Sequence, residues 1–154
     1  MSAAKSFRDL RVYQVARAAA SEVFEASKSF PRDERCSLVD QIRRSSRATK
    51  AIIAEAWARR RYQAVFINKI DEALGEASET QSWLDDAYDC GYIDSVQFEK
   101  MDGDRRSIGA MLARMSDRAS DFCKYASDTN YRGTTSEDPL SWSDEIGDES
   151  DSAT

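Results

Sequence analysis

Residues 43–61 read RRSSRATKAIIAEAWARRR, and this stretch combines an apolar helical face with a basic one. At 100° per residue, one side of a helix through this region collects Val39, Ile42, Ser46, Thr49, Ile53, Ala56 and Trp57. The neighbouring side spans about 80° of arc, includes Ala54 and Ala58, and carries a basic stripe of Arg43, Arg47, Lys50 and Arg61. The pattern predicts a helix that packs through its apolar face and presents cations on the other.

Apolar residues at intervals of three and four extend from this stretch over the first 126 positions. The whole chain of 154 residues contains only two prolines and six glycines, which favours long helices. Local signals place the helix ends: Ser6 and Asp94 as N-caps, Pro31 in a first turn and Gly91 as a C-terminal stop. The predicted helices cover about residues 6–29, 32–60, 63–90 and 95–126.

Four helices of similar length with short connections predict an all-α, up-down-up-down antiparallel four-helix bundle. The turn near residues 61–63 contains neither Gly nor Pro and is inferred from the usual length of helices. Two glycines inside the last helix, Gly103 and Gly109, weaken it by up to ~1 kcal/mol each relative to alanine, so we expect its first turns to fray. A second apolar stripe on the first helix predicts contacts with other subunits; it consists of Val12, Val15 and Ala19, beside Leu10 and Tyr13.

Charge is distributed unevenly along the chain, whose net charge is −6. Residues 1–61 carry 14 Lys/Arg against 7 Asp/Glu, whereas residues 62–126 carry 7 against 13. Residues 127–154 carry 8 Asp/Glu and one Arg, with few apolar residues, and are predicted to be a disordered acidic tail after a single domain at 1–126. The tail can compete with nucleic acid for the basic stripe, carry a partner motif, or serve solubility, and the sequence leaves these open.

The residues required by common catalytic and metal sites are missing. The chain has no histidine, and its three cysteines lack metal-ligand spacing, so we expect no catalytic residue, no metal site and no cofactor. Glu72, Glu76 and Glu79 share a helical stripe that is interpreted as a solvated or subunit-facing acidic face. No apolar run long enough for a membrane span and no signal-peptide pattern occurs, which predicts a reduced, cytoplasmic protein.

Two further features allow more than one interpretation. We favour a surface ion pair between Glu55 and Arg59, four residues later on the same helix; the alternative is that Glu55 is a buried partner of an arginine from another protomer. Aromatic residues near the basic segment are favoured as core or subunit interface, with base stacking as the alternative; they are Trp57, Tyr62, Phe66, Trp83 and Tyr88.

Four sequence blocks occur in a family-like order: SFRDLRVYQVARAAA from residue 6, SFPRDERCSLVDQIRRSSR from residue 29, IAEAWARRRYQAVFINKI from residue 53 and EASETQSWLDDAYDCGYI from residue 76. The chain thereby resembles the S23-like bacterial four-helix-bundle proteins encoded by intervening sequences of 23S rRNA genes. That family includes the accessory variability protein of diversity-generating retroelements. The resemblance covers roughly residues 5–125, and the chain departs from it at Ile52, where the family usually has an asparagine.

The resemblance implies a four-helix protomer that assembles as a homopentamer and has no enzymatic activity. In the retroelement branch it also implies a basic surface that binds nucleic acid and a reverse transcriptase. The family's basic positions correspond here to Arg43 and Arg44 in the QIRR block and to Arg59, Arg60 and Arg61 after the IAE block.

The basic stripe and the family resemblance together predict a non-enzymatic, homo-oligomeric protein that binds RNA or RNA/DNA through phosphate contacts. The candidate nucleic-acid-binding residues are Arg43, Arg44, Arg47, Lys50, Arg59, Arg60 and Arg61. The alternative is an interaction module whose basic and acidic halves pair between protomers, with no nucleic-acid binding.

Overall fold

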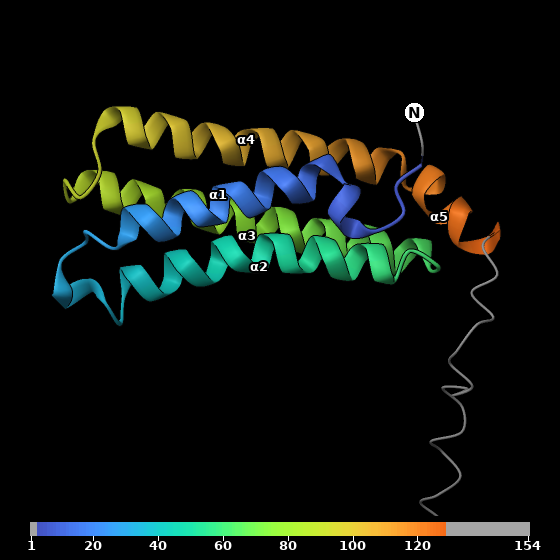
Figure 1. The fold of residues 1–154 in the computed structure, drawn as a ribbon, viewed down its shortest axis with the longest axis horizontal. Helices are drawn as coiled ribbons and strands as arrows, with labels where there is room; N and C mark the ends of the chain where they lie inside the picture. Colours follow the sequence, from blue (N-terminus) through green and yellow to red (C-terminus); the bar gives the residue numbers. More distant parts are fainter. Residues whose placement is uncertain (1–2, 129–154) are drawn as a thin grey trace, which may run out of the picture.

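The computed structural model describes residues 3–128, and every regular element within them is helical. Four long helices lie side by side along one axis: α1 (Arg11–Ser27), α2 (Leu38–Ala58), α3 (Gln63–Asp89) and α4 (Ser95–Asp117) (Figure 1). Consecutive helices run in opposite directions, and α1 contacts both α2 and α4, while α3 contacts α2 and α4. This confirms the predicted all-helical bundle.

The first predicted helix, 6–29, is shorter and interrupted. Ser6 and Asp9 form the expected capping box, since the Ser6 hydroxyl accepts from the Arg8 N–H at 3.1 Å and Asp9 accepts from the Ser6 N–H at 3.0 Å. The box caps only a 3₁₀ turn, η1 (Phe7–Asp9), because Leu10 is extended and α1 starts after it. Leu10 is buried in the same apolar cluster as residues of all four long helices, so tertiary packing ends the local helix there.

The second helix was predicted at 32–60, but α2 begins later than predicted and ends two residues earlier. Residues after Pro31 form a 3₁₀ turn, η2 (Arg32–Glu34), and α2 begins at Leu38. The Glu34 carboxylate accepts hydrogen bonds from the Ser37 hydroxyl at 2.8 Å and from the Leu38 N–H at 3.2 Å. Glu34 thus satisfies an amide of the first turn of α2 from outside that helix, and the chain between them is not helical.

The predicted ends around the third helix are confirmed. Gly91 has a φ of 75°, the left-handed conformation that commonly follows the last turn of a helix, and it terminates α3. Asp94 accepts from the Gln97 N–H at 2.8 Å, and Gln97 accepts from the Asp94 N–H at 3.0 Å, which forms the predicted capping box of α4. The inferred turn between the second and third helices also exists, since α2 ends at Ala58 and α3 begins at Gln63.

The fourth predicted helix, 95–126, is divided at Arg118 and not at its glycines. α4 runs unbroken through Gly103 and Gly109, and α5 (Ala119–Asp128) follows after a bend. A Cβ atom on Gly109 would lie 3.3 Å from Leu74 Cδ1, so this glycine allows α3 and α4 to approach closely. The bend directs α5 against α3, where the Phe122 and Phe66 rings stack with centroids 5.7 Å apart. The first two residues of the predicted tail, 127–154, belong to α5, and the rest of it lies outside the described residues.

The core consists of two buried clusters that follow the bundle axis. The larger contains Ile53, Phe66, Ile70 and Leu112, and the smaller, near the α3–α4 turn, contains Val23, Ile42 and Leu84. The second stripe of α1 belongs to this core: Val12 is 3% exposed and Ala19 is 2% exposed, with Val15 packed against them. Because α1 contacts two neighbouring helices, the protomer itself buries both stripes, and the inference of a subunit contact from this stripe was wrong.

Candidate nucleic-acid interface

Arg43 and Arg47 lie on the side of α2 that faces α1. The Arg43 guanidinium carbon lies 4.7 Å from the centroid of the Phe24 ring of α1, and that of Arg47 lies 5.4 Å from it. Arg43 Nε also donates a hydrogen bond of 2.7 Å to the Ser27 hydroxyl. A third cation, Lys28 Nζ, lies 4.8 Å from the same ring. We call this group the Phe24 cluster; it comprises Phe24, Lys28, Arg43 and Arg47.

The Phe24 cluster carries excess positive charge. Lys28 forms an ion pair of 3.1 Å with Glu25. Among the described side chains, no carboxylate lies within ion-pair distance of Arg43 or Arg47. Among the described side chains, both arginines contact the Phe24 ring, and Arg43 also contacts the neutral Ser27 hydroxyl, so their positive charge is not neutralised by a carboxylate.

The rest of the predicted basic stripe is split between two places. Lys50 follows Arg47 by one helical turn, is half-buried, and has no polar partner within the described part of the chain. Arg61 lies beyond the end of α2, where its guanidinium is 5.7 Å from the Tyr62 ring. At about 1.5 Å per residue, the end of α2 at Ala58 lies about 22 Å along the helix from Arg43, so Arg61, beyond that end, is separated from Arg43 by most of the length of the helix. The continuous stripe predicted through residue 61 is thus correct only as far as α2 extends.

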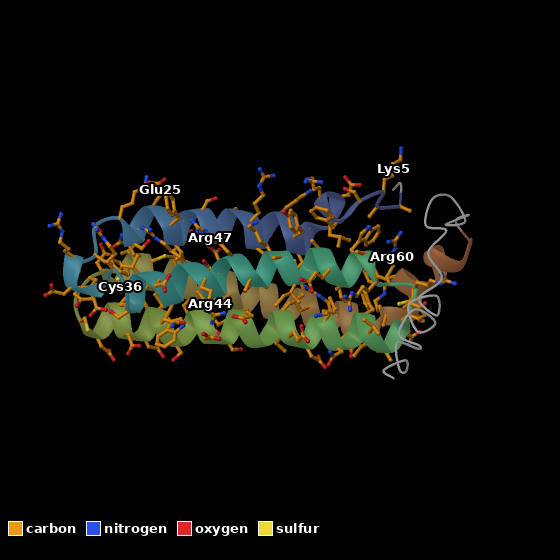
Figure 2. All side chains as sticks on the ribbon, turned by 90° about the horizontal axis from the view of Figure 1, so that it is seen from below. Lys5, Glu25, Cys36, Arg44, Arg47 and Arg60 are labelled. Atoms are coloured by element: carbon orange, nitrogen blue, oxygen red, sulfur yellow. The ribbon has the colours of Figure 1, made fainter. Side chains whose placement is uncertain are left out.

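Arg44 differs from its neighbour Arg43 because its guanidinium forms ion pairs with α3. Its guanidinium contacts Glu79 at 2.5 Å and Glu76 at 3.5 Å. The hydrogen bond to Glu79 and the charges of both carboxylates raise the pKa of Arg44 above its usual value. Figure 2 shows Arg44 on the α3 side of α2 and Arg47 on the α1 side. The predicted site residue Arg44 is therefore neutralised within the protomer.

The acidic stripe of α3 is likewise used inside the protomer. Glu72 pairs with Lys69 at 2.9 Å, and Lys69 also pairs with Glu55 of α2 at 3.2 Å. The predicted Glu55–Arg59 surface pair was wrong: the exposed Glu55 pairs with Lys69 of the neighbouring helix α3, and no ion pair with Arg59 occurs among the described side chains. Together with the Arg44 pairs, these contacts hold α2 to α3 and place Glu72, Glu76 and Glu79 in ion pairs of this chain.

The arginines after α2 have separate positions. Arg60 folds back over the Trp57 ring, with 3.9 Å from its guanidinium carbon to the centroid, and donates to the Trp57 carbonyl at 2.8 Å. It therefore stabilises the C-terminal turn of α2. Arg59 and Arg61 are exposed to solvent at this end of the bundle.

The aromatic residues near the basic segment divide between core and surface. Phe66 is completely buried, and Trp57 and Trp83 pack against the two core clusters. Tyr62 is 58% exposed and Tyr88 is 43% exposed, so these two lie outside the core of the protomer, and their place at a subunit interface stays a prediction. Neither tyrosine belongs to the Phe24 cluster.

Sequence reasoning missed the contribution of α1 to this surface. Phe24 is half-buried and lies beside the main apolar face of α1, and Lys28 follows it by four residues, on the same side of the helix. An aromatic residue outside the packing face with a cation one turn later was the available signal. The packing of α1 against α2, which adds two arginines to the same ring, cannot be read from either helix alone.

The described residues contain no group of three or more His, Cys, Asp or Glu arranged to hold a metal. All three cysteines are free thiols; Cys36 and Cys90 are exposed, and partial burial raises the pKa of the Cys123 thiol. Within residues 3–128, none of the helices has both the length and the apolar character needed to cross a membrane.

Comparisons with known proteins agree with the fold and with the sequence blocks. The family described as 23S rRNA-intervening sequence protein matches residues 8–114. Among solved structures, a protein of unknown function from the S23 ribosomal protein family of Bacteroides thetaiotaomicron is similar, with 29% identity and a TM-score of 0.64. The match covers 69% of this chain and 95% of that one. No curated protein sequence matches significantly. Since the family match spans more than half of its residues, the chain belongs to the 23S rRNA-intervening sequence protein family.

Proposed function

We propose that this chain is a non-enzymatic, homo-oligomeric accessory protein that binds RNA or RNA/DNA through the basic edge between α1 and α2. The observation that carries the proposal is the contrast within α2. Arg44 is neutralised by two glutamates, whereas Arg43 and Arg47 have no carboxylate partner among the described side chains. Cations left without an internal counter-charge attract polyanions.

Phosphate contacts, and not base contacts, are the interaction this edge favours. On the same side of α2 as Arg43, Arg47 and Lys50 lie the small residues Ala51, Ala54 and Ala58. Their side chains cannot form hydrogen bonds with the edge of a base. Arginine and lysine contacts to phosphates give affinity with little sequence preference. We therefore propose sequence-independent binding of a nucleic-acid backbone.

The family name supports a connection with RNA, because it refers to intervening sequences of 23S rRNA. The similar solved structure is assigned by its name to an S23 ribosomal protein family. A role beside a retroelement reverse transcriptase and assembly as a pentamer are parts of the proposal that rest on the family resemblance, and a cytoplasmic location is a part that rests on the sequence pattern alone. Exposed apolar side chains of α3 and α4 are available for subunit contacts; they are Leu74, Tyr88 and Val96.

The rival function is an interaction module whose opposite charges pair between protomers. It is weakened because Arg44, Glu76 and Glu79 already pair within one protomer. Filter binding with two unrelated single-stranded RNAs and an RNA/DNA hybrid at ~100 mM salt, alongside size-exclusion chromatography, separates the two functions. We expect comparable binding of all three probes by an oligomer. Absence of binding would overturn the proposed function and favour the interaction module.

A further inference from the structure

The strongest unexplained feature of the molecule is the convergence of three cations on one aromatic ring. The charged centres of Lys28, Arg43 and Arg47 lie 4.8, 4.7 and 5.4 Å from the Phe24 centroid. No two of them can therefore be more than about 10 Å apart. Like charges at this separation repel one another at low salt, and the single paired carboxylate, Glu25, compensates only one of the three.

We propose that the Phe24 cluster is a phosphate-binding centre for a nucleic-acid backbone, in which Lys28, Arg43 and Arg47 contact phosphate oxygens and Phe24 and Ser27 act as positioning residues. This inference rests on the proposed function and assigns its contacts to one end of the α1/α2 edge. A phosphate offers several acceptor oxygens and negative charge, so it can satisfy donors from two helices at once.

Ser27 orients the arginine that lies closest to the ring. Its side chain is buried, donates to the Phe24 carbonyl at 3.0 Å and accepts from Arg43 Nε at 2.7 Å. With Nε engaged, the two terminal nitrogens of Arg43 remain available to a ligand in a fixed direction. A guanidinium held in this way loses less side-chain entropy on binding than a mobile one.

Phe24 organises the cluster and is not a platform for base stacking. Cations from both helices already occupy positions around its ring, at distances typical of cation–π contacts. A base stacked there would have to displace at least one of them. The geometry therefore favours a backbone contact that does not distinguish sequences.

The other candidate arginines lack this arrangement. Arg44 is paired with two glutamates, and Arg60 is directed to the Trp57 ring and carbonyl. Arg59 and Arg61 are exposed on the chain after α2, at the opposite end of that helix from Arg43. Binding loss should consequently be concentrated in variants of the Phe24 cluster.

The test measures fluorescence anisotropy of a labelled 20-nucleotide oligo(U) with the full chain at several salt concentrations. The double variant Arg43→Gln/Arg47→Gln should weaken binding at least tenfold at ~50 mM salt. It should also make the negative slope of log K against log salt shallower by about 1.4, since each single-strand phosphate contact contributes about −0.7 to that slope. The matched control Arg44→Gln removes the same charge from the adjacent position and should leave that slope unchanged.

Phe24 is tested by two variants that alter no charge. Phe24→Leu should weaken binding about two- to fivefold with an unchanged salt slope, because the cations remain but lose the ring that positions them. Phe24→Tyr keeps the aromatic face and should bind like the parent. Equal losses in both variants, or no loss in Phe24→Leu, would overturn the positioning role.

The outcomes separate this inference from the proposed function. If the parent chain binds oligo(U) and the double variant keeps its slope, the phosphate centre is wrong while nucleic-acid binding stands. If the parent chain does not bind, the proposed function fails and the inference fails with it. Should the double variant lose its helical circular-dichroism signal, the single variant Arg47→Gln decides, because Arg47 is exposed and has no hydrogen bond among the described residues. The salt slope of this variant should be shallower than that of the parent by about 0.7.

Discussion

Arg43 and Arg44 are adjacent in sequence but lie on different sides of α2, one against the Phe24 ring of α1 and the other in an ion pair with Glu79 of α3. The 100° rotation between consecutive helical residues accounts for this separation. One arginine consequently belongs to the surface that we propose binds nucleic acid, and the other joins two helices of the bundle. Their substitutions should therefore have different consequences.

Arg44→Gln should lower the free energy of unfolding by about 0.5–1 kcal/mol, because half-exposed ion pairs contribute within this range. The matched variant Arg47→Gln should change it by less than about 0.5 kcal/mol, since Arg47 has no ion pair within the described part of the chain. Urea denaturation followed by circular dichroism gives both values. The reverse order would contradict the assignment of the two arginines.

Arg105 should be a major contributor to the α1–α4 contact. Its side chain is 3% exposed and donates to the carbonyls of Met101 at 3.2 Å and Ala19 at 3.1 Å. Burial lowers the pKa of its guanidinium below the usual value. Arg105→Ala should cost about 2–4 kcal/mol through the cavity and the lost hydrogen bonds. Arg105→Met, which fills most of the space, should cost less, and equal stability of the two variants in urea denaturation would argue against this account.

Glu34 should make stability depend on pH in the acidic range. Hydrogen bonds from the Ser37 hydroxyl and the Leu38 N–H lower its pKa below the ordinary 4.5. The native state thus favours the carboxylate, so its contribution is complete above the unfolded-state pKa and is lost as pH falls through the lower folded-state pKa. The melting temperatures of the parent and of Glu34→Ala should differ at pH 7, and the difference should shrink as pH falls below the ordinary pKa of 4.5. A difference that persists unchanged to pH 2 would rule out this linkage.

Two glycines should respond to alanine in opposite ways. Gly91→Ala should destabilise the fold by about 1–2 kcal/mol, because a φ of 75° is strained for an L-residue although the added Cβ meets no atom within 4 Å. Gly103→Ala should stabilise it by up to ~1 kcal/mol, since that residue is inside α4 and the new Cβ would lie 3.5 Å from Arg106 Nη2, an ordinary contact. Thermal unfolding of the two variants provides the comparison, and a shift of the same sign in both would be inconsistent with these backbone conformations.

Local signals in the sequence were sufficient for the Gly91 stop and the Asp94 capping box, because each depends on residues within one turn. They failed at Leu10 and Arg118, where packing against other helices interrupts a segment whose own pattern continues as helix. The helical wheel correctly separated Arg43 and Arg47 from the packing face of α2. The partners of Arg44, Glu55 and Phe24 depend on which helices become neighbours, and that information is absent from the periodicity of a single helix.

Removal of residues 129–154 should leave the helical signal of the bundle unchanged, because their sequence lacks the apolar pattern of a core and the described helices and buried clusters lie within residues 3–128. It also deletes seven Asp/Glu and one Arg, so attraction of the remaining chain for nucleic acid should increase at low salt. Circular dichroism and oligo(U) anisotropy of the truncated chain check both expectations. A large loss of helicity would show that the tail contributes to the fold.

The salt dependence of binding by the unchanged chain tests the proposed function most directly. Titration of two unrelated single-stranded RNAs of equal length between ~50 and 200 mM salt should give parallel lines of log K against log salt. With Lys28, Arg43 and Arg47 each contacting a phosphate, the slope should be about −2 or steeper for both RNAs. A slope near zero, a strong preference for one sequence, or no binding at ~50 mM salt would contradict a phosphate-binding surface between α1 and α2.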